Sequence, residues 1–372
     1  MSIEEIQDLV ERGLMSTKRK DVAKAYITYR QERTKVREAN GTYVKNIENK
    51  LNIENNQMAN ANVDEESFGG RMGEASSANL KEYALNYCMP KWMADLYRNN
   101  EIYIHDLDHY ALGDHNCLSV PFDKLLANGF NTRQTDVRPA NSVNTAFQLV
   151  AVIFQLQSLN QFGGVSATHL DWTMVPYVRK SFYKHYKDGL KWCRNRISSN
   201  TITIPEQLQR INDKTPIDAI EYQEECLQYP YQYAIEMTER ETYQAVEGMY
   251  HNLNTLQSRS GNQLPFTSIN YGTCTLPEGR MVIKALLDVS IEGIGKLHKT
   301  SIFPCGIFQC MKGVNREPED PNYDLFKLAL KSTAQRLYPN YANVDWTGNA
   351  GYDREDPRTY FSTMGKRKLQ LM

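Results

Sequence analysis

The sequence lacks any hydrophobic run long enough to cross a membrane, because its longest uninterrupted apolar stretch is residues 149–154. It also lacks an excess of charge, since 43 basic residues stand against 44 acidic ones. That balance argues against a nucleic-acid binder with a broad cationic surface. The first residues are acidic and amphipathic, unlike a secretory signal. We therefore expect a globular protein with neither a membrane nor a nucleic acid as its partner.

The seven cysteines form no C-x-x-C pair, and their number is odd. A disulfide framework or a compact zinc site is therefore disfavoured, and a reducing cytoplasm is the expected location. The sequence also has neither a G-x-x-x-x-G-K-[ST] loop nor a Rossmann fingerprint, so the conventional nucleotide-binding folds are unsupported. Its 372 residues are enough for one large domain or for two or three smaller ones.

The order of periodic segments predicts an α/β domain. A pair of helices is expected over 1–37, a polar linker that ends in a tight turn over 38–75, and the α/β part from 76 to 372. The strongest helix runs from Ser142 to about Gln161 and is apolar around most of its circumference, which indicates a core or a subunit interface. Other helices are expected near 78–87, 90–99, 176–188, 238–256, 281–297 and from 320 to just before Pro339, and strands over 101–105, 264–271 and 301–309.

Three histidines and three aspartates lie between His105 and His115 and could be metal ligands. No fourth ligand is spaced convincingly, and we predict no metal site. The alternative is a polar strand end whose groups satisfy each other and the nearby backbone.

Cys117 follows a polar, glycine-containing turn and precedes the apolar residues Leu118 and Val120. Its thiol is therefore expected where a polar mouth meets a core, a position suited to redox or nucleophilic chemistry. A buried, inert cysteine remains the alternative.

A second polar cluster, residues 255–263, comes just before the strand predicted at 264–271. Its arginine, serine, glycine and asparagine residues can bind phosphate through side chains and backbone N–H groups. The alternative is a hydrogen-bonded loop that only connects a helix to a strand.

At these segments the sequence resembles the anaerobic, glycyl-radical (class III) ribonucleoside-triphosphate reductases. The resemblance covers about residues 40–365 and is most specific over 254–272. The stretches that carry it are 103–108, 115–118, 161–164, 254–272, 320–326 and 361–365. Residues 1–37 look like the last two helices of an ATP-cone, a regulatory module that precedes many of these enzymes.

The resemblance implies a ten-stranded α/β barrel, of which this chain would be the first part. A finger loop through the barrel carries a cysteine that becomes a thiyl radical, and the enzyme converts ribonucleoside triphosphates to the 2′-deoxy forms used as DNA precursors. A radical-SAM enzyme installs the glycyl radical, ATP and dNTPs are effectors, zinc is structural, and a homodimer is expected. Cys117 matches a second cysteine, which faces the ribose. The predicted substrate-binding residues are Arg259, Ser260, Asn262 and Met364.

The sequence departs from the family pattern after Met364-Gly365. The family's finger-loop motif continues with Cys-Arg, whereas Lys366 follows here, and the sequence given stops at Met372. The remaining strands, the four-cysteine zinc site and the glycyl-radical loop have no counterpart in it. We therefore expect an N-terminal fragment that is inactive alone and needs a C-terminal half in trans. The alternatives are a non-catalytic effector-binding or dimerisation module and a truncation product without a function.

Overall fold

The computed structural model describes residues 3–51, 67–113, 117–159, 163–193, 211–220, 225–257, 263–346 and 351–363. The chain divides into two compact units. The first comprises residues 1–60 and 64–114, and the second comprises residues 61–63 and 115–372.

The first unit is helical in its described part. A hairpin of α1 (Ile3–Ser16) and α2 (Lys20–Leu51) is held by Arg30, whose guanidinium contacts the carboxylates of Glu4, Asp8 and Glu11. The unit continues with α3 (Phe68–Tyr83), a π-helical turn (Ala84–Cys88), α4 (Lys91–Arg98) and a 3-10 turn (Leu107–His109). A small core of Ala84, Leu85, Met89, Ala94 and Leu107 joins these later elements.

Two expectations for this unit are wrong. The described parts of the expected 38–75 linker are helical: α2 continues to Leu51, and residues 68–73 form the first turns of α3 instead of a tight turn. Ser67 caps α3 by accepting a hydrogen bond from the Gly70 N–H, which explains how a glycine-rich start becomes a helix. The strand expected over 101–105 is also not formed, and these residues lie in bends and turns.

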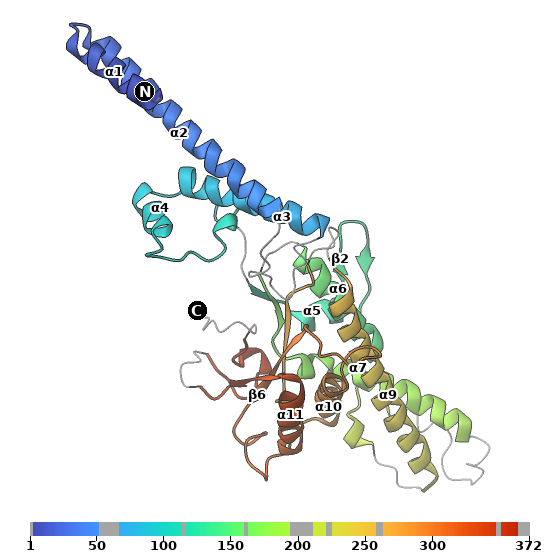
Figure 1. Cartoon of the computed structure of the whole chain (residues 1–372). Coiled ribbons are helices and arrows are strands. Elements are labelled where there is room, and N and C mark those ends of the chain that lie inside the picture. The colour runs from blue at the N-terminus through green and yellow to red at the C-terminus, as the bar shows by residue number, and fades with distance from the viewer. Residues whose placement is uncertain are drawn as a thin grey trace. The chain divides into compact units, whose positions relative to one another are not determined.

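The second unit is built on a parallel sheet (Figure 1). Its strand order is β1 (Leu118–Ser119), β4 (Val165–Ala167), β5 (Thr267–Tyr271), β6 (Cys305–Cys310) and β7 (Asn340–Asn343). All four neighbouring pairs are parallel. A short antiparallel pair, β2 (Phe130–Asn131) with β3 (Asp136–Val137), stands apart from this sheet. The α/β class is therefore confirmed, with an open parallel sheet.

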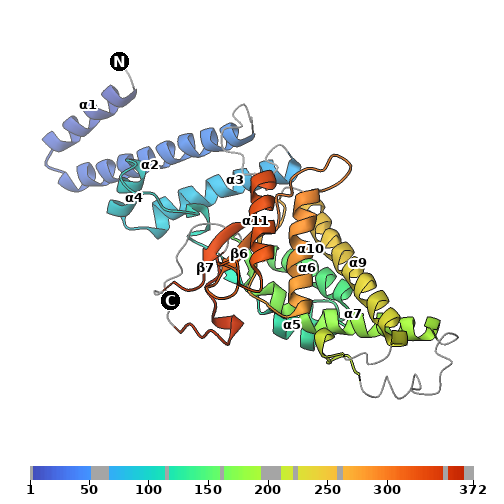
Figure 2. The same cartoon turned by 90° about the horizontal axis from the view of Figure 1, so that it is seen from below.

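Helices connect the parallel strands, because a parallel pair needs a crossover. They are α5 (Phe122–Asn128), α6 (Val143–Ser158), α7 (Leu170–Cys193), α9 (Glu225–Thr255), α10 (Pro277–Glu292) and α11 (Tyr323–Arg336). Figures 1 and 2 show α7, α9 and α10 side by side. Val165, Ile269 and Phe308 from the strands lie with side chains from these helices in the main core.

The helix predictions are largely confirmed, with errors at the starts and at some ends, since α10 ends at Glu292 and α7 continues to Cys193. Ser142 caps α6 as its position suggests, and its hydroxyl accepts a hydrogen bond from Thr145 N–H. α9 begins at Glu225 and not at Thr238, whose hydroxyl donates to the carbonyl of Ala234 inside the helix. Similarly, α7 begins at Leu170, so that Pro176 lies within its first two turns. In the described residues no helix is both long and apolar enough to span a membrane.

Candidate functional site

The two faces of the parallel sheet differ in chemistry. Side chains alternate along a strand, so Ile269 and Tyr271 of β5 face the helices while Ser268 and Asn270 face the other way. The strand register places Ser119, Ser166 and Ser268 side by side on β1, β4 and β5. We call the face that carries these serines, Asn270 and Gln309 the polar face.

Cys117 lies at the start of this polar face. It precedes Ser119 by two residues and therefore points to the same side of the sheet, opposite to Leu118 and Val120, which pack in or against the main core. The Gly164 N–H donates to Cys117 Sγ at 3.3 Å. The thiol is half-buried, whereas burial raises the pKa of Cys274 and Cys305 and raises that of Cys310 to about 11.

Asn270 links the polar face to the far end of the described chain. Its Oδ1 accepts from the Thr363 N–H at 3.1 Å, and its Nδ2 donates to the Thr363 carbonyl at 3.1 Å. The same Nδ2 lies within hydrogen-bond distance of Ser166 Oγ at 3.1 Å and the Ala167 carbonyl at 3.0 Å. Ser166 Oγ also contacts the Thr363 carbonyl at 3.4 Å. One buried amide thus holds both backbone groups of a residue 93 positions away.

Gln309 on β6 extends this contact by two residues. Its Nε2 donates to the Phe361 carbonyl at 2.9 Å and contacts the Thr168 carbonyl at 3.4 Å. Residues 361–363 therefore cross the polar face and are hydrogen-bonded by side chains from β4, β5 and β6. Gln309 Oε1 and Ser268 Oγ are buried without a hydrogen-bond partner. Buried groups of this kind are uncommon, and they leave this face with unused hydrogen-bonding capacity.

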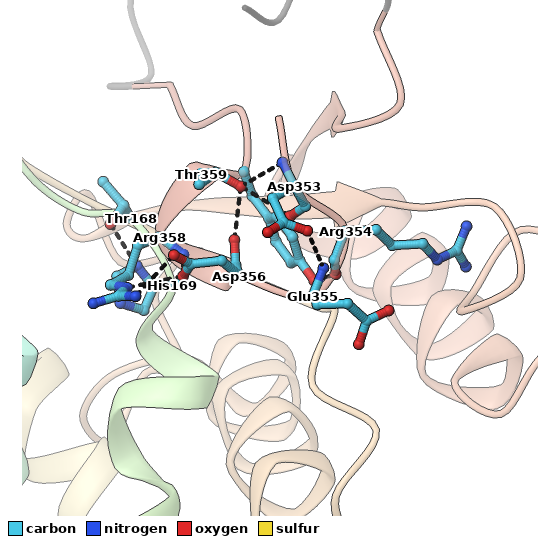
Figure 3. A network of polar contacts seen from close by, with 9 residues as sticks. Thr168, His169, Asp353, Arg354, Glu355, Asp356, Arg358 and Thr359 are labelled. Carbon is cyan, nitrogen blue, oxygen red and sulfur yellow. Dashed lines mark hydrogen bonds and ion pairs between the residues drawn. The ribbon is translucent and has the colours of Figure 1, made fainter. Parts of the chain in front are cut away.

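The loop that leads to this segment is fixed by its own polar contacts (Figure 3). Thr359 Oγ1 donates to the carbonyls of Asp353 and Asp356, and Arg358 forms an ion pair with Asp356 at 2.8 Å. The loop borders a shallow cavity of about 450 Å³ at the carboxyl end of β4, where Thr168 Oγ1 and His169 Nδ1 lie 2.7 Å apart. Burial lowers the pKa of His169, against the nearby carboxylates.

A buried carboxylate, that of Asp171, fixes the loop after β5. Asp171 Oδ2 accepts from the N–H groups of Gly272, Thr273 and Cys274 at 2.9, 3.0 and 2.9 Å. The amides of Asn315 and Asn322 donate to the Gly272 carbonyl from the other side. Burial raises the pKa of Asp171, although the backbone donors oppose that shift. These contacts fix the end of β5 and hence the place of Asn270.

The other predicted site residues are only partly placed. Arg259, Ser260, Asn262 and Met364 lie outside the described residues. In the histidine-rich segment, His105 pairs with Asp106 at 3.2 Å and His109 with Asp108 at 3.5 Å. Within the described residues no three His, Cys, Asp or Glu side chains are grouped as metal ligands.

Sequence reasoning did not single out Ser166, Asn270 and Gln309. A signal was present, since each is a polar residue that alternates with apolar residues in a buried strand. Alternation along β5 could have placed Ser268 and Asn270 on one face. Their contact with residues 361–363 could not have been found in this way, because it depends on where the chain returns after β7.

The fold and the site define an α/β protein with an open parallel sheet, helices on one face and a cysteine-bearing polar face opposite. A family model described as anaerobic ribonucleoside-triphosphate reductase matches residues 59–369, and the ATP cone domain matches residues 1–35. The chain belongs to the anaerobic ribonucleoside-triphosphate reductase family.

Named relatives agree with this assignment. The chain is 30% identical over 348 residues to the anaerobic ribonucleoside-triphosphate reductase of Haemophilus influenzae and 28% identical to that of Escherichia coli. It is 30% identical over 302 residues to that of phage T4. These matches cover 93%, 93% and 80% of this chain but 44% of each relative. The chain thus spans less than half the length of the curated relatives it matches.

Solved structures of the anaerobic ribonucleotide reductase from Thermotoga maritima are also similar to the chain. The structure with dATP in the specificity site has a TM-score of 0.47 and 15% identity, over 75% of this chain and 44% of that one. The structure with dATP and CTP has a TM-score of 0.46 and 14% identity, over 75% and 43%.

Proposed function

We propose that this chain supplies the Cys117 side of the reaction cavity in an anaerobic ribonucleoside-triphosphate reductase. The cavity would take ribonucleoside triphosphates and yield their 2′-deoxy forms. In this proposal Cys117 faces the ribose, and Arg259, Ser260, Asn262 and Met364 contribute to substrate binding. We place the reaction in the cytoplasm, in keeping with five described cysteines that are free thiols.

One observation supports the proposal most strongly: Cys117 and Thr363 share the polar face. Gly164, which contacts the thiol, lies two residues before Ser166. The Cα atoms of Gly164 and Ser166 are therefore about 7 Å apart along the chain. Ser166 in turn contacts the Thr363 carbonyl. The segment that continues into the predicted finger-loop motif therefore leaves from the same face that carries the thiol.

We also propose that the chain is inactive alone. The sequence has no cysteine after Cys310, and Lys366 stands where the resemblance implies the thiyl cysteine. An amine cannot take the place of a thiol in forming a thiyl radical. We propose that this cysteine, the glycyl radical and the structural zinc come from a C-terminal half, and that a radical-SAM enzyme activates the assembled protein.

Regulation and assembly belong to the same proposal. α1 and the first half of α2 lie in the segment that matches the ATP cone domain, so we assign effector response by ATP or dNTPs to this end of the chain. We also propose a homodimer through α6, whose Val152, Leu156 and Leu159 form an exposed apolar stripe at helical spacing. Gln155, on the same helix, is not part of this stripe. Its side chain donates a hydrogen bond to the Leu256 carbonyl of its own chain at 2.8 Å.

The experiment is anaerobic reduction of a ribonucleoside triphosphate with the activating enzyme, S-adenosylmethionine and reductant. The chain alone is expected to form no deoxynucleotide above background. With the C-terminal half in trans, the chain is expected to form deoxynucleotide. Its Cys117→Ser variant is expected to form none under the same conditions. Product from the chain alone, or equal product from both forms, would refute the proposal.

A further inference from the structure

Asn270 makes a pattern of contacts that no other common side chain can reproduce. A carboxamide presents one acceptor and one donor group side by side, and here both are used on a single residue, Thr363. This pairing copies the exchange of hydrogen bonds between neighbouring strands, with a side chain in place of a strand. Aspartate would lack the donor, and leucine, which is similar in shape, would lack both groups.

The anchor is rigid at both ends. Asn270 is fully buried on the central strand of the sheet, and its amide also contacts Ser166 and Ala167 on β4. On the other side, Tyr360 is held in a small core with Met311, Val314 and Val344, and its hydroxyl donates to the Arg354 carbonyl at 2.6 Å. The segment between Tyr360 and Thr363 thus spans two fixed points.

From this geometry we infer that Asn270 is a positioning residue that fixes the Thr363 backbone, and with it the path of residues 361–363, on the polar face that carries Cys117. The inference rests on the proposed function for its consequence, because residues 361–365 are the stretch that resembles the family's finger-loop motif. Asn270 itself does not touch the thiol. It acts through the Thr363 backbone, and Gln309 supports it through Phe361.

The test measures amide hydrogen exchange residue by residue on the full chain, without nucleotide. In Asn270→Leu, the Thr363 amide is expected to lose protection roughly tenfold, as for two hydrogen bonds of ordinary strength. Asn340→Leu makes the same change at an exposed position of β7 and is expected to leave Thr363 unchanged. If Asn270 only braced β4 against β5, the strand amides would lose protection as much as Thr363.

Asn270→Asp gives a second readout that a purely structural role would not produce. As a carboxylate, the new side chain has no proton for the Thr363 carbonyl, whereas the protonated carboxyl group can donate one. Protection of Thr363, taken relative to Asn340→Leu at the same pH, is therefore expected to recover as the pH falls through the pKa of that carboxyl group. If Asn270→Leu does not fold, the pH dependence of Thr363 protection in Asn270→Asp tests the inference by itself.

Two results would overturn the inference: protection of Thr363 in Asn270→Leu equal to that in Asn340→Leu, or no recovery at low pH in Asn270→Asp. Either would leave the proposed function standing, since that is tested by product formation and depends on Cys117.

Discussion

At the scale of single residues, the most consequential side chains are buried polar groups that hold backbone. Asp171 holds three successive N–H groups after β5, and Asn270 holds both backbone groups of Thr363. Cys117 was predicted to be a functional thiol from its place between a polar turn and an apolar run and from the family motif. Its partner Gly164 lies in a stretch that also carried the resemblance, but the contact needs the register of β1 against β4.

Asp171→Ala should be among the most destabilising single changes in the second unit. It leaves the N–H groups of Gly272, Thr273 and Cys274 buried and unpaired, and we expect a loss of about 3 kcal/mol or more in the free energy of unfolding. Urea unfolding measures it. The control Asp188→Ala, on the same helix but facing solvent with Lys191, should change stability by less than about 0.5 kcal/mol.

Glu241 should make part of the stability depend on pH. Burial acts to raise the pKa of Glu241, but the hydrogen bond and charge of His185, 2.7 Å away, outweigh it and hold that pKa below its usual value. The folded state therefore binds this proton less readily than the unfolded state. The stabilisation is present above the unfolded pKa and is lost as the pH falls through the folded one.

Glu241→Gln removes this dependence. Unfolding curves at a series of pH values should show the wild-type chain about 1 kcal/mol more stable near neutral pH, with the difference closing below about pH 4. A difference that stays constant from neutral to acid pH would show that Glu241 contributes through packing and not through its charge.

At the scale of elements, hydrophobic periodicity predicted which segments are helices but not where they start. The Thr238–Glu241 pattern satisfied the rule for a helix start, yet the apolar face continues upstream with buried Ala234, so α9 extends back to Glu225. In the first unit, the polar composition of residues 38–51 indicated a linker. Those residues instead continue α2, because a helix that has already formed can be extended at little cost per residue.

The apolar stripe on α6 gives a prediction at this scale. Leu156 is 38% exposed in the single chain, so Leu156→Glu adds a charge on the solvent side without disturbing the core. We expect it to shift the chain from dimer to monomer in sedimentation at micromolar concentration, with the helix content unchanged. Leu330→Glu, the same substitution at an exposed leucine of α11, is the matched control for added charge. A wild-type chain that sediments as a monomer would contradict the proposed seam.

At the scale of the whole molecule, the sequence predicted an α/β domain and, through its resemblance, one part of a barrel. The open order β1-β4-β5-β6-β7 agrees with this. What could not be predicted is the return of residues 361–363 across the polar face, because contacts of such long range depend on the completed sheet. We propose that the nucleotide binds on this polar face, which has Cys117 at one end and Thr363 over it.

The most direct test is the alkylation rate of Cys117, measured by mass spectrometry with and without a ribonucleoside triphosphate whose binding is followed independently. The exposed Cys88 is the internal reference. We predict that saturating nucleotide slows alkylation of Cys117 several-fold and leaves Cys88 unchanged. Equal rates at Cys117 with nucleotide demonstrably bound would contradict the claim that the thiol lines the substrate cavity.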